Sequence, residues 1–284
     1  MSSYRFCRSD DVSLLVEAYN RCYRVHFPEL QLLTVDGFKQ WIRRLEIWTS
    51  SCMVASIGAE PIGVLIAGKR THESLVFRVG VAPGHQRNGH ASHLMDSLAQ
   101  KLAILGPRRL VAEVPAERSA ARRFVERCGY RVEARYTDFE HPGSMERPRS
   151  ADLIFPVTVE ELQANEALSL GVGRSWHRAA ESLTRRADSL VGSALATASR
   201  IEAFALHTLP SEGPLEVLAL GCADETRREM WLRPLLQQLC STPRAVRLTR
   251  LEEGDPPFEL IKSCGFHSVA HNTAYAFEAG ETTA

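Results

Sequence analysis

Apolar residues recur along the first half of the chain with two periods, about 3.6 residues in some segments and about two in others. The longer period predicts amphipathic helices, and alternation predicts strands with one buried face. The predicted elements are, in chain order, a strand at Tyr4–Arg8, helices at Asp10–Tyr23 and Val35–Glu46, and the hairpin strands Cys52–Ile57 and Ile62–Gly68. The pattern therefore indicates a domain that mixes α and β elements.

The segment Val79–Leu94, VGVAPGHQRNGHASHL, joins an apolar strand to a helix through a proline-marked turn and a Gly-bearing loop. Helical spacing is clear at Leu94, Leu98, Leu102 and Leu105, and Gly106-Pro107 is a stop signal. Free N–H groups and the positive dipole end at a helix N-terminus favour a pyrophosphate, which Gly89 would let approach the backbone. Many such turns need a glycine only for the turn itself, so the loop alone does not decide its role.

The elements predicted after the loop support a role for it in binding a pyrophosphate. A strand is predicted at Arg109–Val114, a short helix at Ser119–Cys128 and an alternating strand at Tyr130–Phe139. In this order, with Gln86-Arg87-Asn88-Gly89-His90-Ala91 fitting Q/R-x-x-G-x-G/A, residues 3–140 resemble the GNAT superfamily of N-acetyltransferases. The resemblance implies an α/β (α+β) fold with a mixed, mostly antiparallel sheet flanked by helices, and acetyl-CoA as cosubstrate.

Length and composition narrow the remaining possibilities. The chain has 284 residues, enough for two domains of common size, and its 34 basic and 34 acidic residues give no electrostatic case for nucleic acid or an anionic membrane as partner. Seven cysteines form no C-x-x-C pair, which favours a reducing cytoplasm. Apolar runs stay shorter than the roughly 18 residues of a membrane span, so we expect a soluble protein, monomeric or homodimeric.

The second half of the chain repeats the pattern of the first. Ile62–Gly68 corresponds to Ile201–His207 at an offset of 139 residues, Leu75–Val81 to Leu215–Gly221 at 140, and Cys128-Gly129-Tyr130 to Cys264-Gly265-Phe266 at 136. The second copy has thus lost four residues where the first carries its loop. Its segment Cys222–Trp231 has no glycine and adds Asp224, Glu225 and Glu229, which would repel a pyrophosphate.

We therefore interpret the chain as a tandem GNAT with an acyl-CoA site in the first copy only. The expected domains are residues 1–142 and a degenerate copy at residues 150–284, joined by a linker near His141–Arg149 that is rich in turn formers. In the second copy we expect a strand at Asp152–Val157 and helices at Thr158–Leu168 and Ser175–Leu190.

The resemblance implies a role for two neighbouring segments in binding acetyl-CoA. Main-chain groups of Val79, Gly80 and Val81 should bond the pantetheine arm, and one N–H should serve as oxyanion donor. The pyrophosphate should lie on the loop formed by Gln86, Arg87, Asn88, Gly89, His90 and Ala91. Gly80 is unfavourable in mid-strand, and a bulge, close ligand approach or an edge position would explain it.

Direct transfer needs a base that takes a proton from the amine. Glu113, in Leu110–Val114, resembles the glutamate of the L-E-V strand that serves as base in ribosomal-protein N-terminal acetyltransferases of this superfamily. An acid on an apolar strand can instead face solvent or pair with an arginine. Glu73 and His72 are the alternative bases.

The departing thiolate also needs charge relief, and here the chain departs from the family. Val125 stands where many GNATs carry a tyrosine, and Arg118 replaces the usual Asn at the head of the same helix. Tyr130 and Tyr136 are possible replacements for the acid. The missing tyrosine leaves open a second function, a non-catalytic acyl-CoA-binding sensor or scaffold.

The acceptor, a primary amine of a small molecule or a peptide, should lie between the splayed strands and Arg21–Leu33, a segment that includes Tyr23, His26, Phe27 and Glu29. His85, His90 and His93 crowd the phosphate loop, but they have no Cys or carboxylate partners at matching spacing. We therefore expect solvated histidines and no metal.

Overall fold

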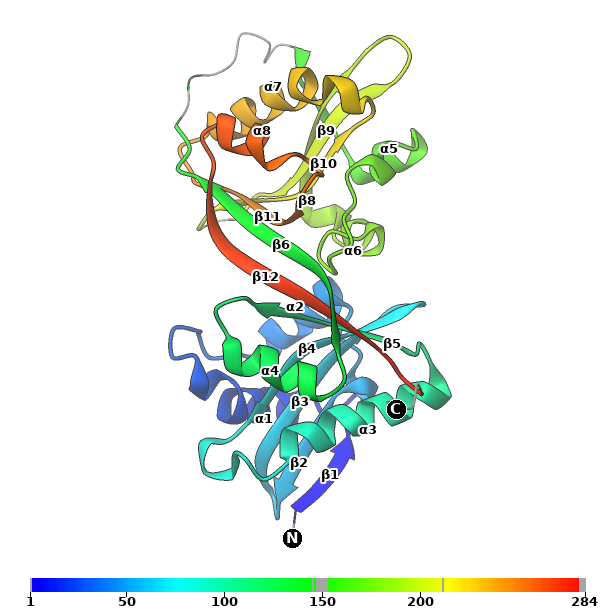
Figure 1. Ribbon diagram of the computed structural model, residues 1–284, viewed down its shortest axis with the longest axis vertical. Helices are drawn as coiled ribbons and strands as arrows, with labels where there is room; N and C mark the ends of the chain where they lie inside the picture. Colours follow the sequence, from blue (N-terminus) through cyan, green and yellow to red (C-terminus); the bar gives the residue numbers. More distant parts are fainter. Residues whose placement is uncertain (1, 145, 147–152, 211, 281–284) are drawn as a thin grey trace. The chain divides into compact units, whose positions relative to one another are not determined.

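The structure is a computed structural model that describes residues 2–144, 146, 153–210 and 212–280 (Figure 1). It contains two compact units, each a sheet with helices on both faces. Unit 1 consists of Met1–Val114, Arg118–Glu133 and Ala274–Ala284, and unit 2 of Pro115–Glu117 and Ala134–Thr273. Neither unit is one continuous stretch of chain.

Unit 1 has the sheet order β1-β2-β3-β4-β5-β12-β6. Its own strands are β1 (Ser2–Phe6), β2 (Met53–Ile57), β3 (Glu60–Lys69), β4 (Glu73–Val81) and β5 (Arg109–Pro115). Its helices are α1 (Val12–Cys22), α2 (Val35–Leu45), α3 (His90–Leu105) and α4 (Ser119–Arg127), with 3-10 turns η1 (Arg24–His26), η2 (Thr49–Ser51) and η3 (Pro83–His85). The elements predicted for this region are confirmed to within a few residues.

Unit 2 repeats this layout with the sheet order β12-β6-β11-β10-β9-β8-β7. Its strands are β7 (Phe155–Val157), β8 (Leu190–Ala196), β9 (Ile201–Thr208), β10 (Leu215–Cys222) and β11 (Val246–Glu252). Its helices are α5 (Val159–Ala164), α6 (Ala180–Arg185), α7 (Arg228–Cys240) and α8 (Phe258–Ser263), with 3-10 turns η5 (Leu168–Leu170), η6 (Ala187–Ser189) and η7 (Glu225–Arg227).

Two long strands contribute to both units. Strand β6 (Arg131–His141) belongs to unit 1 up to Glu133 and to unit 2 beyond it, whereas β12 (His267–Glu278) begins in unit 2 and enters unit 1 at Ala274. Tyr275 and Phe277 accordingly pack in the core of unit 1. The compact units therefore differ from the contiguous division into residues 1–142 and 150–284 that the repeat suggested.

Alternation along the strands separates two apolar layers in unit 1. Leu110, Ala112 and Val114 of β5 pack in the same cluster as the buried leucines of α3. Val64 and Ile66 of β3 pack in the other cluster, with α1 and α2. Because neighbouring residues of a strand face opposite sides of a sheet, the residues of β5 between the buried ones lie on the α1 and α2 face.

The long helix expected at Ser175–Leu190 is wrong. Only α6 and the turn η6 form there, and Leu190 already begins strand β8. The segment before α6 instead turns inward, with Trp176 1% exposed and Arg178 4% exposed. Tertiary contacts thus override the helical spacing. Part of the linker and of the expected strand Asp152–Val157 lies outside the described residues, and the described part forms β7.

Candidate functional site

Among strands β1 to β5, neighbouring strands pair antiparallel except for β4 and β5, which are parallel. These two strands separate after three residue pairs. Their three pairs are Glu73↔Arg109, Ser74↔Leu110 and Leu75↔Val111. Strand β4 meanwhile continues its antiparallel pairing with β3 as far as Val81. Beyond Leu75 one edge of β4 is therefore available to a ligand.

The register of β3 and β4 shows which peptide groups face that edge. Gly80 pairs with Val64, and the N–H of the following Ala82 donates to the carbonyl of Ile62 at 2.9 Å. In an antiparallel ladder alternate residues bond to the same neighbour, so Gly80 also points its groups toward β3. Val79 and Val81 point theirs away from β3, toward the open edge.

Gly80 is explained by a contact within the protein. A Cβ at this position would lie 2.5 Å from the carbonyl oxygen of Cys22 and 2.8 Å from Cα of Tyr23, at the end of α1. The register shift of β4 falls at Phe77 instead. Close packing of α1 therefore explains the glycine at this position, and the bulge lies three residues earlier.

The loop after β4 forms the N-terminus of α3, as its sequence predicts. Gly89 is the residue before the helix and has φ of 80°, a left-handed conformation that favours glycine. Its missing side chain would point into open space, and residues 86–89 are exposed. The first N–H groups of α3 have no intrahelical acceptor, so this exposed turn can bind an anion.

The start of the loop is bonded to the segment after α1. Nε2 of His26 in η1 lies 2.8 Å from the carbonyl oxygen of Val81 and 3.1 Å from Nε2 of Gln86. A pocket of about 380 Å³ lies beside this contact, lined by Asn20, Arg21, Val25, Ala82, Pro83, Gly84 and His85. His26 thus connects the expected acceptor wall to the expected phosphate loop.

The histidines of the loop do not share one environment. His90, the first residue of α3, is 8% exposed, and its Nδ1 shares a hydrogen bond of 2.5 Å with the hydroxyl of Tyr4 in β1. The Tyr4 ring also lies 4.0 Å from the ring of His93, centroid to centroid. The expectation that all three histidines are solvated is therefore wrong for His90. Among the described residues no group of His, Cys, Asp and Glu has the arrangement of a metal site.

Glu113 lies just beyond the point where β4 and β5 part. It is half-buried on β5, two residues past the last pair with β4, and alternation places it on the α1 and α2 face. Glu73 lies instead at the closed end of the strands, 3.4 Å from Arg109 and 3.7 Å from Arg70. Burial raises the pKa of Glu73 and the arginines oppose that rise, so its surroundings are those of a structural ion pair.

Tyr130, one candidate for the acid, does not reach the α1 and α2 face. Tyr130 is 4% exposed among apolar residues of the α3 layer, and burial raises its pKa. Its hydroxyl has no hydrogen-bond partner among the described residues. Tyr136 belongs to unit 2, where it pairs with Glu252 of β11. Val125, at the family's usual tyrosine position, is buried in the same α3 layer.

Unit 2 contains the same parting of parallel strands, but a side chain fills it. Strands β10 and β11 pair over Leu215↔Val246, Glu216↔Arg247 and Val217↔Leu248 and then separate. Nε of Arg178 donates to the carbonyl of Leu218 at 3.0 Å, and its Nη1 to that of Arg250 at 3.4 Å. Burial lowers the pKa of Arg178 to about 10, which still leaves the guanidinium charged at neutral pH.

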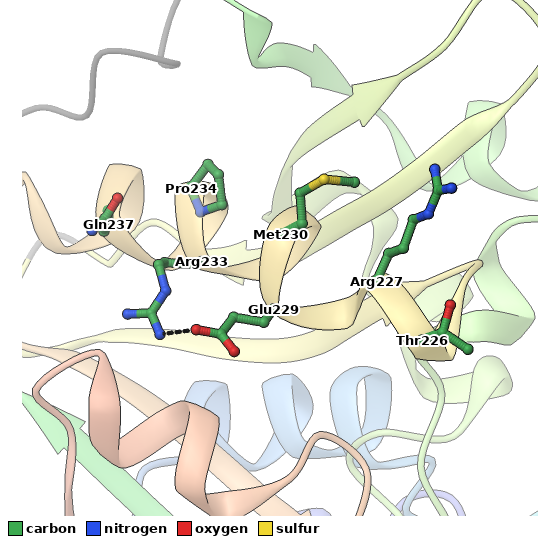
Figure 2. Close-up of a pocket in the computed structure, with 7 residues that line it drawn as sticks. All are labelled: Thr226, Arg227, Glu229, Met230, Arg233, Pro234 and Gln237. Atoms are coloured by element: carbon green, nitrogen blue, oxygen red, sulfur yellow. Dashed lines mark hydrogen bonds and ion pairs between the residues drawn. The ribbon is translucent and has the colours of Figure 1, made fainter.

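The turn before α7 also lacks the features of the phosphate loop. Oδ1 of Asp224 accepts hydrogen bonds from the backbone N–H of Thr226 at 2.9 Å and from its hydroxyl at 2.6 Å. A carboxylate therefore occupies the place of an anion. A pocket of about 510 Å³ lies along η7 and α7, where Glu229 and Arg233 form an ion pair of 2.6 Å (Figure 2). This pocket follows the side of α7 and is separate from the strand edge.

Comparison with known proteins agrees with this geometry. Residues 12–130 match the Acetyltransferase (GNAT) family, a region that includes both the parted strands and the loop. The match thus covers most of the N-terminal part of the chain. The described part of the chain has no helix of the length and apolarity that crossing a membrane requires.

Solved structures that resemble the whole chain share its tandem fold. A GCN5-related N-acetyltransferase from Sphaerobacter thermophilus matches with a TM-score of 0.67 at 15% identity, over 98% of this chain and 96% of that one. A tandem GNAT protein from the clavulanic acid biosynthesis pathway matches with a TM-score of 0.63 at 13% identity, over 99% and 100%. A putative acetyltransferase from Pyrococcus horikoshii has a TM-score of 0.62 at 18% identity, over 98% and 89%.

Proposed function

We propose that unit 1 transfers an acetyl group from acetyl-CoA to a primary amine of a small molecule or a peptide by direct attack. The observation that carries this proposal is the open edge of β4, which leads directly into the glycine turn at the N-terminus of α3. One element can thus bind the pantetheine arm and the next the pyrophosphate. The match to the GNAT family supports the same assignment.

In this proposal the cofactor binds through backbone groups. Val79 and Val81 offer peptide groups on the open edge, although the Val81 carbonyl already accepts from His26. The pyrophosphate lies over residues 86–91, where Gly89 leaves the space that a side chain would take. The peptide groups of Gly80 face β3, so in this proposal Gly80 lines the pantetheine path without bonding to it.

Glu113 is the proposed base. The amine nitrogen gives its proton to the Glu113 carboxylate and attacks the thioester carbonyl carbon, and the tetrahedral intermediate then breaks its C–S bond. The products are the acetylated amine and the CoA thiolate, which takes a proton from water. We assign no side-chain acid, because Val125 and Tyr130 lie in the α3 layer of the core.

Glu113→Gln tests the base. The change keeps the shape of the side chain and removes its basicity, so kcat should fall by roughly 10²- to 10⁴-fold and the acidic limb of the pH–rate profile should disappear. Acetyl-CoA affinity, measured by calorimetry, should not change. Near-normal kcat with an intact acidic limb would exclude Glu113. Val125→Tyr is the companion variant, and a faster rate there would show that thiolate departure limits turnover.

The buried Val125 favours one alternative, a protein that binds acyl-CoA without transferring the acyl group. Such a protein would bind acetyl-CoA at unit 1 and acetylate no member of a broad amine panel. Calorimetric binding together with acetylation of any panel amine above the uncatalysed rate would decide for the enzyme.

A further inference from the structure

The face of unit 1 that carries Glu113 also carries an aromatic stack with a guanidinium at each end. The rings of Tyr23 and Phe27 are stacked with centroids 4.7 Å apart. The guanidinium carbon of Arg78 lies 5.4 Å from the Tyr23 centroid, and that of Arg118 lies 4.7 Å from the Phe27 centroid. Both arginines are thus held on the wall that the acceptor is expected to contact.

Arg78 is close to the proposed reaction centre. The strands part after Leu75↔Val111, and two residues further along each parallel strand are Phe77 and Glu113. Arg78 follows Phe77 directly, and its guanidinium lies 3.8 Å from the centroid of the Phe77 ring. Phe77 packs against the α1 and α2 layer, and the Arg78 guanidinium lies against its ring. This face therefore carries a positive group from β4, Arg78, and a negative group from β5, Glu113.

The guanidinium of Arg78 retains donors for a ligand. Its Nη1 donates to the carbonyl of Phe77 at 2.7 Å, and Tyr19 also bonds to the group. Its Nε is buried and has no hydrogen-bond partner among the described residues. A buried donor without an acceptor is unfavourable, and a carboxylate accepts from two guanidinium N–H groups at once.

Arg118 has a different setting at the outer end of the stack. Its side chain is 48% exposed and lies 3.7 Å from Glu29, which is 61% exposed, so this ion pair is weak. The partly exposed cation adds positive potential at the rim, whereas Arg78 offers directed donors deeper in the site.

We propose that the acceptor is an amine that also carries a carboxylate, as an amino acid does, with Glu113 taking the proton of its amino group and Arg78 binding its carboxylate. This inference rests on the proposed function and adds the chemical class of the acceptor. The aromatic stack beside Arg78 provides an apolar surface for the rest of the molecule. Arg78 determines specificity in this assignment, and Glu113 performs the chemistry.

The experiment uses the full chain, acetyl-CoA and matched amines, each offered as the free carboxylate and as its neutral amide. Phenylalanine with phenylalaninamide and alanine with alaninamide are suitable pairs. The readout is the ratio of kcat/KM for the two members. A charge-assisted hydrogen bond predicts a ratio of roughly 10- to 100-fold in favour of the carboxylate.

Three variants locate the effect. Arg78→Met should reduce the ratio to about one, and Arg78→Lys, which keeps the charge but loses the paired donors, should give an intermediate value. Arg43→Met, at an exposed position on α2, is the matched control and should keep the wild-type ratio. Acetyl-CoA affinity by calorimetry verifies that each variant is folded.

The outcomes separate the two proposals. Acetylation of amides and carboxylates at equal rates, or a preference that survives Arg78→Met, would overturn the carboxylate assignment and leave the acetyltransferase intact. Acetylation of no amine in the panel would contradict the proposed function and with it this inference.

Discussion

The two pairs of parallel strands, β4–β5 in unit 1 and β10–β11 in unit 2, have the same short parallel pairing but different surroundings. Each pair is joined over three residues and then separates. In unit 1 the open edge leads to Gly89 at a helix N-terminus. In unit 2 the carbonyls beyond the last pair accept from Arg178, and the turn before the helix is capped by Asp224.

The difference shows how a binding site can be closed while its fold is kept. Parted strands leave backbone groups without partners, and buried groups of that kind are unfavourable unless something bonds to them. In unit 1 we assign that role to the pantetheine arm of a cosubstrate. In unit 2 a side chain of the protein itself takes that role, since the buried guanidinium of Arg178 donates hydrogen bonds to the carbonyls of Leu218 and Arg250.

The largest expected effect comes from filling the phosphate turn of unit 1. Gly89→Glu adds a side chain and a negative charge where the pyrophosphate should lie, so acetyl-CoA affinity should fall by at least roughly 100-fold. The matched control is Gly213→Glu in unit 2, because Gly213 has φ of 83° against 80° for Gly89 and both would direct a side chain into open space. Calorimetry that finds Gly89→Glu and the control equally tight would refute the site assignment.

Removing the internal donor of unit 2 should reduce stability without creating a site. Arg178→Met removes the buried donor that bonds the carbonyls of Leu218 and Arg250, which should lower the free energy of unfolding by about 1–3 kcal/mol in urea titrations. Relief of the buried charge limits the loss. Arg174→Met, at a side chain 70% exposed, should be nearly neutral. One acetyl-CoA should still bind per chain, and a second saturable site in Arg178→Met would disprove our account of unit 2.

The smallest effect is a pH dependence confined to unit 2. His207 of β9 is 6% exposed and burial lowers its pKa, whereas the residue at the equivalent position of unit 1 is Gly68. As the pH falls below about 6.5, this histidine is protonated in the unfolded chain but stays neutral in the folded chain. Its contribution to the free energy of unfolding is therefore fully present above that pH and declines below it.

Between pH 7.5 and 5.5 the free energy of unfolding should fall by about 1 kcal/mol through this one group. His207→Gln should remove that part of the slope, and His72→Gln, at an exposed position in unit 1, should not. Identical slopes for wild type and His207→Gln, measured by denaturant titration at both pH values, would show that His207 does not contribute.

Sequence patterns predicted much of unit 1 and less of unit 2. The glycine loop, the leucines of α3 and the hairpin of β2 and β3 follow local periodicity, and local periodicity is what a sequence displays. Prediction failed at Ser175–Leu190, where the helical spacing is real but Trp176 and Arg178 are buried instead. A signal was present, since an arginine beside a tryptophan on a predicted amphipathic helix has no obvious solvent face.

The candidate site likewise has parts that local sequence predicts and parts that depend on residues far apart in the chain. The glycine turn before α3 could be predicted from the chain because a helix N-terminus is built from consecutive residues. The role of Gly80 could not, because Cys22 and Tyr23, which require it, lie far away in sequence. The ring stack that carries Arg78 and Arg118 was invisible for the same reason.

The sequence by itself determined the order of elements, the internal repeat and the position of the glycine turn before α3, since each is a pattern among residues close together or at a constant offset. Only the tertiary structure decided that β6 and β12 each contribute to both units. The alternation along β12 does not mark where one unit ends and the other begins, and this depends on side chains such as Tyr275 and Phe277, which pack in the core of unit 1. The same kind of long-range contact closed one pair of parted strands with Arg178 and left the other accessible, because packing acts between residues that no local pattern connects.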